Sequence, residues 1–232
     1  MTAPPHRPSA ATQWAAIVAK DLRIELRSRE ILITAALFAL VIVTLFLFSG
    51  FGESVDQRRA APGVLWTTIA FVGTLVFSRT FQREREHGAI AGLLLAPAIV
   101  GPLFAAKLFV NLLLVGIMEA LLVPAVAITF GLPLGGAIGA VVGTVVLGTL
   151  GFAALGTVLA AALSTLRLRD VLLPIVLYPL CLPLLLASVK ATALVAAGDV
   201  GVAAPWLVIV VVFDVLYLVL GRWLFGQALD AT

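Results

Sequence analysis

Residues 31–51 read ILITAALFALVIVTLFLFSGF, an apolar run without a charged side chain. A bilayer core is about 30 Å thick, and about 20 apolar residues in a helix cross it. The run therefore predicts a membrane-spanning helix. Working outward from it, we find further apolar runs of comparable length, which predict spans at residues 63–81, 108–130, 137–163, 171–189 and 205–225. The expected fold is an all-α integral membrane protein with six transmembrane helices in one domain, residues 1–232.

The composition of the whole chain agrees with a membrane protein. Of its 232 residues, 62% are hydrophobic and only 12% are charged, and the mean hydropathy is +1.17. Soluble domains carry about 25% charged residues, so most classes of soluble enzyme are excluded. The net charge of +3 does not indicate nucleic acid as a partner, because the basic residues stand beside apolar spans. Cys181 is the single cysteine and cannot form an internal disulfide.

The distribution of Lys and Arg predicts the orientation of the spans. Six spans place both termini on one side of the membrane, and cytoplasmic segments carry the excess of Lys and Arg. With the termini inside, three basic residues fall outside: Arg58, Arg59 and Lys190. The inner segments then hold Arg7, Lys20, Arg23, Arg27, Arg29, Arg79, Arg83, Arg85, Lys107, Arg167, Arg169 and Arg222. The sequence predicts that both termini are cytoplasmic.

Residues 10–30 precede the first span and show the spacing of an amphipathic helix. The apolar side holds Trp14, Ile17, Val18, Leu22 and Leu26, and the other side holds Lys20, Arg23 and Arg27. This pattern is typical of a helix that lies in the headgroup layer of a membrane. The alternative is a cytoplasmic extension of the first span.

The longest predicted connection, residues 82–107, has the pattern of a docking surface. It begins with a charged end and continues with an apolar stripe at helical spacing. The charged end is Arg83, Glu84, Arg85, Glu86 and His87, Gly88 comes next, and the stripe is Ile90, Leu93 and Leu94; Pro97 and Pro102 interrupt the helical pattern after the stripe. A short amphipathic helix below the bilayer would suit a cytoplasmic partner. Alternatively, the charges only terminate the second span, and the apolar part lies on the membrane.

Two carboxylates fall inside predicted spans. Glu119 lies near the middle of the third span and Asp214 near the middle of the sixth. A charge at the bilayer centre costs at least about 2.5 kcal/mol, so such a residue faces the protein interior and has a partner. We expect each carboxyl to be protonated, hydrogen-bonded to a neighbouring helix, or turned toward a polar cavity. A substrate path or proton relay is one interpretation, and hydrogen bonding between helices is the other.

Glycine and proline mark two other spans. Gly135, Gly139 and Gly143 form a row with a spacing of four that lets another helix approach closely. The fifth span contains Pro174, Pro179 and Pro183, each of which removes a backbone donor and favours a kink. Broken helices line the route of some transporters, but a static kink explains the prolines equally well.

Several catalytic motifs are absent from the sequence. It contains no G-x-x-x-x-G-K-[ST] phosphate loop, no H-E-x-x-H pair and no cysteine–histidine cluster with metal-ligand spacing. The two histidines are His6 and His87, and both fall in segments predicted to be cytoplasmic. The chain is therefore not expected to be an enzyme, and no catalytic, cofactor-binding or metal-binding residue is predicted.

The arrangement resembles the type 2 ABC exporter permeases. The resemblance includes six spans, an interfacial N-terminal helix, and a charged loop with E-x-x-x-G and LLLAP followed by a lysine. In that family the loop between spans two and three is the coupling helix, which sits in a groove on the ATPase subunit. The residues that fall on this pattern are Glu84, Glu86, Gly88, Leu93, Leu94, Leu95, Pro97 and Lys107.

Further motifs narrow the resemblance to the CcmB family, the permease subunits of the haem exporter in cytochrome c maturation. These are KDLRIELRSRE, APGVLW, REREHGAIAGLLLAP, LRDVLLPIVLYPLCLPLLLAS and FDVLYLVLGRWLF, and together the similarity covers nearly the whole chain. One departure is that many members carry an acidic residue where Ala91 or Gly92 stands here.

The resemblance implies a set of partners in the bacterial inner membrane. Two copies of the permease would pair with two copies of a CcmA-like ATPase, which would bind and hydrolyse the ATP. CcmC-like and CcmD-like membrane subunits and a haem chaperone would handle haem, which is the implied cargo. Both haem export and ATP-driven release of the haem-loaded chaperone fit the resemblance, and the scarcity of histidine agrees better with the second role.

Other functions stay open at the level of sequence. An ABC exporter permease for a lipid or another small molecule would have the same topology. A membrane scaffold or assembly factor without transport would also have it, but would not depend on the charged segment 83–87. An intramembrane enzyme is disfavoured, because Glu119 and Asp214 have no nucleophile, metal site or histidine beside them in the sequence.

Overall fold

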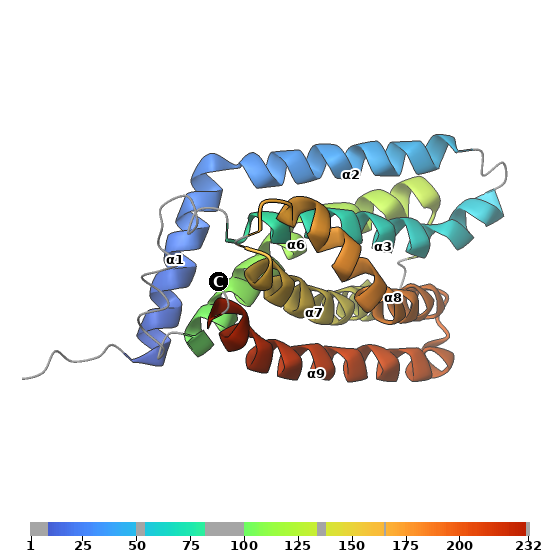
Figure 1. Ribbon diagram of the computed structural model, residues 1–232. Helices are drawn as coiled ribbons and strands as arrows, with labels where there is room; N and C mark the ends of the chain where they lie inside the picture. The colour runs from blue at the N-terminus through green and yellow to red at the C-terminus, as the bar shows by residue number, and fades with distance from the viewer. Residues whose placement is uncertain (1–8, 50–53, 82–99, 134–137, 165, 231–232) are drawn as a thin grey trace, which may run out of the picture.

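The computed structural model describes residues 9–49, 54–81, 100–133, 138–164 and 166–230, and every element in these ranges is a helix. Six of these helices, all except α1, are long and apolar enough to cross a membrane, which confirms the predicted all-α, six-span class. Figure 1 shows them side by side in one bundle. The helices are α1 (Ala10–Ser28), α2 (Glu30–Phe48), α3 (Ser54–Arg79), α6 (Val100–Phe130), α7 (Ile138–Ala162), α8 (Arg169–Ala196) and α9 (Val200–Asp230).

Several helices extend beyond the predicted spans. α3 begins nine residues before residue 63, α6 begins at Val100 instead of 108, and α8 continues to Ala196 instead of 189. At 1.5 Å per residue, the 31 residues of α6 measure about 46 Å, which exceeds the hydrocarbon core of about 30 Å. Hydropathy identifies only the part of a helix that contacts lipid tails. The helix itself extends beyond that part, because its backbone hydrogen bonds continue there.

α1 is a separate helix and not a straight continuation of α2. It begins after Ser9, whose hydroxyl accepts a hydrogen bond from the amide of Thr12. It ends at Arg29, which adopts the left-handed backbone conformation with φ 53°. A residue in this conformation interrupts a helix, and Figure 1 shows α1 running across one end of the bundle, transverse to α2. The C-terminal end of the chain lies at the same end of the bundle.

The apolar side of α1 contacts protein as well as the surroundings of the bundle. Val18 is buried, and Trp14, Ile17 and Leu22 pack against the buried core. The ring of Trp14 meets the ring of Phe109 edge to face, with centroids 5.3 Å apart. The helical periodicity predicted a face in the headgroup layer, but part of that face covers α6, because an apolar stripe can be buried by either environment.

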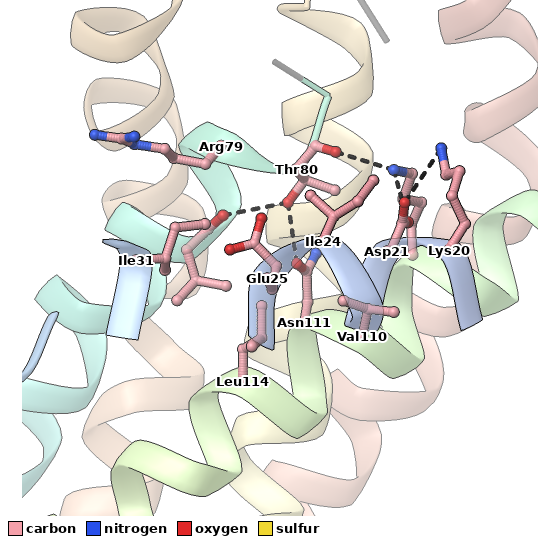
Figure 2. Close-up of a pocket in the computed structure, with 12 residues that line it drawn as sticks. Lys20, Asp21, Ile24, Glu25, Ile31, Arg79, Thr80, Val110, Asn111 and Leu114 are labelled. Carbon is pink, nitrogen blue, oxygen red and sulfur yellow. Dashed lines mark hydrogen bonds and ion pairs between the residues drawn. The ribbon is translucent and has the colours of Figure 1, made fainter. Parts of the chain in front are cut away.

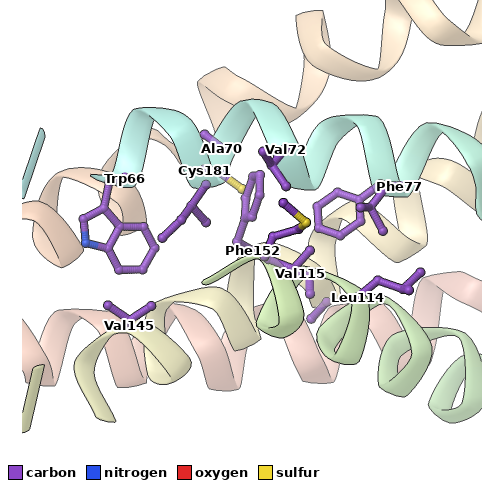
Figure 3. Packing of buried hydrophobic residues seen from close by; sticks show 14 of the residues in the cluster. Trp66, Ala70, Val72, Phe77, Leu114, Val115, Val145, Phe152 and Cys181 are labelled. Atoms are coloured by element: carbon purple, nitrogen blue, oxygen red, sulfur yellow. The ribbon is translucent and has the colours of Figure 1, made fainter. Parts of the chain in front are cut away.

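α7 lies at the centre of the bundle and packs against α3, α6, α8 and α9. Its buried glycines leave room for large side chains from its neighbours. Trp66 of α3 occupies the space beside Gly148, and Phe77 of α3 occupies the space beside Gly156. Figure 3 shows Trp66 and Phe77 directed at α7 on either side of Phe152, whose ring centroid is 5.1 Å from that of Phe77.

Within the described residues, the predicted glycine row makes no close contact with another helix. Gly135 lies outside the described residues. Gly139 and Gly143 are exposed, and a methyl group added to either would meet no atom of another helix within 4 Å. The glycines of α7 that permit close approach come later, at Gly148, Gly151 and Gly156. Spacing alone identifies small-residue rows but does not say which one faces a neighbouring helix.

These two groups of glycines lead to a direct comparison. We expect Gly156→Ala to lower the free energy of unfolding by about 1–3 kcal/mol, because the added methyl overlaps the buried ring of Phe77. Gly143→Ala is the matched control on the same helix and should not lower it. Thermal unfolding of the purified protein in detergent measures both. Equal melting temperatures for the two variants would contradict the packing described for α7.

Candidate functional site

All the predicted coupling residues except Lys107 lie outside the part of the chain that the structure describes. They fall within residues 82–99 and are Arg83, Glu84, Arg85, Glu86, His87, Gly88, Leu93, Leu94 and Pro97. The residues on both sides of this segment are described: Thr80 and Phe81 follow α3, and α6 starts at Val100. The site is therefore built from the polar side chains that flank the segment and from those inside the bundle.

Lys107 is the buried cation of this region, with only 2% of its surface exposed. Its ammonium Nζ lies 2.9 Å from Oδ2 of Asp21 on α1 and donates a hydrogen bond of 3.1 Å to the carbonyl of Thr80. The ammonium also lies 5.2 Å from the centroid of the Phe81 ring, within the range of a cation–π interaction. Lys107 thus joins α1, α6 and the end of α3.

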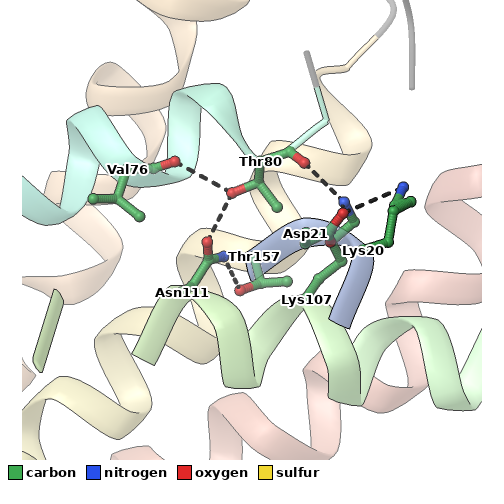
Figure 4. Close-up of polar contacts among 7 residues, drawn as sticks. All are labelled: Lys20, Asp21, Val76, Thr80, Lys107, Asn111 and Thr157. Atoms are coloured by element: carbon green, nitrogen blue, oxygen red, sulfur yellow. Dashed lines mark hydrogen bonds and ion pairs between the residues drawn. The ribbon is translucent and has the colours of Figure 1, made fainter. Parts of the chain in front are cut away.

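Two further residues extend these contacts into the bundle. The hydroxyl of Thr80 lies 3.0 Å from Oδ1 of Asn111, and Nδ2 of Asn111 donates a 2.9 Å hydrogen bond to the hydroxyl of Thr157 on α7. Figure 4 shows this continuous chain of polar contacts. We call Asp21, Thr80, Lys107, Asn111 and Thr157 the polar cluster. It connects the transverse helix α1 to the central helix α7.

A small pocket opens beside the polar cluster, between α1, α3 and α6 (Figure 2). Its polar lining includes Lys20, Glu25 and Arg79. The volume that the centre of a water molecule can reach is about 40 Å³, and about 10–15 Å³ of such volume is enough for one water molecule. Among the described residues, the pocket therefore has room for a few water molecules.

Glu119 of α6 is buried and faces α7. Its carboxylate accepts a hydrogen bond from the hydroxyl of Thr149, and 5% of its surface is exposed. Beside it, an open groove of about 350 Å³ runs between α6 and α7, with an otherwise apolar lining that includes Gly116 and Pro124. The sequence indicated that Glu119 needs a partner, but Thr149 as that partner becomes visible only when the helices are packed.

Asp214 of α9 is buried against another part of α7. Its carboxylate lies against the backbone of Gly151 and near the side chain of Leu184. Only 3% of Asp214 is exposed, and neither carboxylate oxygen has a well-formed hydrogen bond from the described residues. A Cβ atom at position 151 would overlap this carboxylate, so glycine at Gly151 is what leaves space for it.

The structure does not bring Glu119 and Asp214 together. Their contacts on α7, Thr149 and Gly151, are two positions apart and so point about 200° apart around the helix axis. The two carboxylates therefore lie on opposite sides of α7. This arrangement does not form a pair of acidic groups that could share one proton or one ligand.

α8 remains helical through its three prolines, Pro174, Pro179 and Pro183. A proline inside a helix displaces the carbonyl groups of the preceding turn. The hydroxyl of Tyr217 on α9 donates a 2.5 Å hydrogen bond to the carbonyl of Leu180, in the turn before Pro183. Sequence reasoning did not single out Tyr217, although its place three residues after Asp214 puts both on the same side of α9.

Two bonds from α3 hold the other side of α8. The indole Nε1 of Trp66 donates to the hydroxyl of Thr192 over 2.9 Å, and the hydroxyls of Thr74 and Tyr178 lie 3.2 Å apart. Polar side chains on two neighbouring helices thus restrain the proline-rich helix. The sequence signal for these contacts is weak, because single Thr and Tyr residues are common in apolar spans.

Known proteins resemble this chain over most of its length. The family described as "CcmB protein" matches residues 12–232. A "Heme exporter protein B" from Bradyrhizobium diazoefficiens is 26% identical over 195 residues, which cover 84% of this chain and 87% of that protein. The protein of the same name from Paracoccus denitrificans is 30% identical over 183 residues, covering 79% and 84%. That from Haemophilus influenzae is 29% identical over 182 residues, covering 78% and 81%.

The bond between Glu119 and Thr149 can be measured with a double-mutant cycle of Glu119→Met and Thr149→Val. Interhelical hydrogen bonds in membrane proteins contribute about 0.6 kcal/mol on average and at most about 1.7 kcal/mol, and we expect a coupling free energy in that range. Thr129→Val is the control, because among the described residues the Thr129 hydroxyl donates to the carbonyl of Ala125 on its own helix. Strictly additive effects on unfolding would show that the bond does not stabilise the protein.

Proposed function

The chain belongs to the CcmB family, and we propose that it is the membrane permease subunit of a haem exporter that serves the biogenesis of c-type cytochromes. The observation that carries this proposal is the family match over residues 12–232, which includes all six helices able to cross a membrane. Relatives that match most of their own length are named heme exporter protein B. The chain acts as a transporter subunit and not as a catalyst.

The energy for this function comes from a separate subunit. The sequence has no phosphate-binding loop, so we assign ATP hydrolysis to a cytoplasmic, CcmA-like ATPase. Within the predicted connection 82–107, residues 82–99, which precede α6, form the coupling segment that docks on it. The buried position of Lys107 and the burial of Phe81 support this assignment, because they anchor both flanks of the segment in the bundle. A rigid anchor on each side is what transmission of a movement requires.

Haem is the cargo class, and the role that we favour is ATP-driven release of a haem-loaded chaperone. Histidine is a common axial ligand of haem iron, and the sequence has only His6 and His87, both in segments predicted to be cytoplasmic. CcmC-like and CcmD-like subunits and the chaperone would therefore hold the haem. Nucleic acid has no part in this function.

The assembly that fits this role contains two copies of the chain in the bacterial inner membrane, with both termini in the cytoplasm. The positive-inside distribution of Lys and Arg supports this orientation. The position of α1 and of the C-terminal end at one end of the bundle agrees with it (Figure 1). In this orientation α1 lies at the cytoplasmic surface of the membrane.

Gentle detergent purification of the tagged chain from its native membrane tests the assembly. Mass spectrometry should find an ABC ATPase together with haem-handling membrane subunits. Recovery of the ATPase without the haem-handling subunits would favour an exporter of another small molecule or lipid. Recovery without any ATPase would contradict the assignment of residues 82–99 as a coupling segment and favour a scaffold.

Coupling itself is tested by Glu86→Lys and Gly88→Pro. We expect either change to reduce the amount of c-type cytochrome by about tenfold, within the usual range of coupling free energies between sites, because the variants alter the docking segment and leave the spans unchanged. Haem covalently bound to cytochromes in membranes measures the effect.

The matched control is Lys190→Glu, which reverses a charge at an exposed position predicted to lie on the opposite side of the membrane. This variant should keep normal cytochromes. Normal cytochromes in Glu86→Lys as well would count against the coupling role.

A further inference from the structure

The contacts of Lys107 have a particular position relative to the segment 82–99. Lys107 comes after this segment in the sequence, and Thr80 precedes it. The ammonium of Lys107 donates to the carbonyl of Thr80, so one hydrogen bond holds the two flanks of the segment together. The same ammonium pairs with Asp21, which belongs to the transverse helix α1. Figure 4 shows Thr80, Asp21 and Lys107 meeting at this point.

The burial of this ion pair argues against a role in stability alone. Only 3% of the Lys107 side chain and 11% of the Asp21 side chain are exposed. Removing two charges from water costs free energy that their attraction often fails to recover, so an apolar pair of similar size would serve stability as well or better. The best-attested role of buried polar pairs is to fix one arrangement of the elements that carry them.

A nearby ion pair provides a contrast. Arg79 of α3 lies 2.7 Å from Glu30 of α2, but 38% and 61% of their side chains are exposed. An exposed pair such as this one holds its elements weakly, because water screens it. The pair formed by Lys107 is shielded, touches three elements and continues through Asn111 to Thr157 of the central helix. It therefore fixes these elements more firmly than the exposed pair does.

We propose that Asp21, Thr80 and Lys107 form a joint through which α1 moves together with the coupling segment, so that Asp21 and Lys107 are positioning residues for energy transfer. The proposal rests on the proposed function and extends it, since it assigns to α1 a role in transmission in addition to membrane anchoring. A displacement of either flank of the segment would pass directly to α1 and, through Asn111, to α7.

The test uses the complex that contains the full chain and its ATPase. Asp21→Asn combined with Lys107→Met removes both charges at nearly constant volume, so the fold should be retained. We expect this double variant to insert, to retain the ATPase and to hydrolyse ATP, while the covalently bound haem of c-type cytochromes per ATP hydrolysed falls about tenfold, within the range of coupling effects of single sites. If this folded complex yields as much covalently bound haem per ATP hydrolysed as the wild type, the proposal is overturned.

Two other variants make the result specific. Glu30→Gln removes the exposed ion pair with Arg79 and leaves the buried pair, so it should match the wild type. If the double variant does not assemble, Asp21→Lys with Lys107→Asp restores an ion pair but leaves the Thr80 carbonyl without its donor from α6. The complex with the swapped pair should assemble and remain uncoupled. A yield of covalently bound haem per ATP hydrolysed equal to that of the wild type would also overturn the proposal.

The proposed function and the joint fail in different ways. A wild-type chain that retains no ATPase after purification would contradict the proposed function, and with it the joint that depends on it. ATPase-bound variants that make wild-type amounts of cytochrome per ATP would contradict the joint alone and leave the permease role in place.

Discussion

Close approach to α7 is the constraint on which the arrangement of the other helices depends. Lipid tails are as apolar as leucine, so no hydrophobic effect drives helices together inside a bilayer, and close packing must do so. α7 has no side chains at three buried positions, so neighbouring helices can approach its backbone closely there. These positions are Gly148, Gly151 and Gly156. Trp66 and Phe77 of α3 fill two of these positions, and Asp214 of α9 fills the third. The bundle is therefore organised around the helix with the smallest side chains.

The same packing decides where polar groups can exist. Near the middle of the bundle, Glu119 and Asp214 lie on opposite sides of α7, and each is buried. At the end that carries α1, the polar cluster of Asp21, Thr80, Lys107, Asn111 and Thr157 links four helices or their ends. The two residues of the first group are buried against α7. The second lies beside the segment that we propose as the coupling site, where movement has to enter the bundle.

Local patterns predicted those features that depend on one segment at a time. The span at 31–51 and the amphipathic character of α1 follow from hydrophobicity and helical periodicity, and the structure contains both helices. The burial of Glu119 and Asp214 follows from the cost of a charge in hydrocarbon. The row at Gly139 and Gly143 shows the limit of such reasoning. Its spacing is right for a helix contact, but within this chain that side of α7 meets no other helix among the described residues.

The sequence by itself determined the membrane class, the number of spans and, through its motifs, the family. A bilayer imposes apolar runs of set length, and the motifs are contiguous in the chain. Only the tertiary structure decided the partners: Thr149 for Glu119, Gly151 for Asp214, and Asp21 with Thr80 for Lys107. These residues belong to different helices, and any of several Thr or Asp residues could have been the partner. Which one is chosen depends on how the helices pack, and that is settled by the fit of side chains around the glycines of α7.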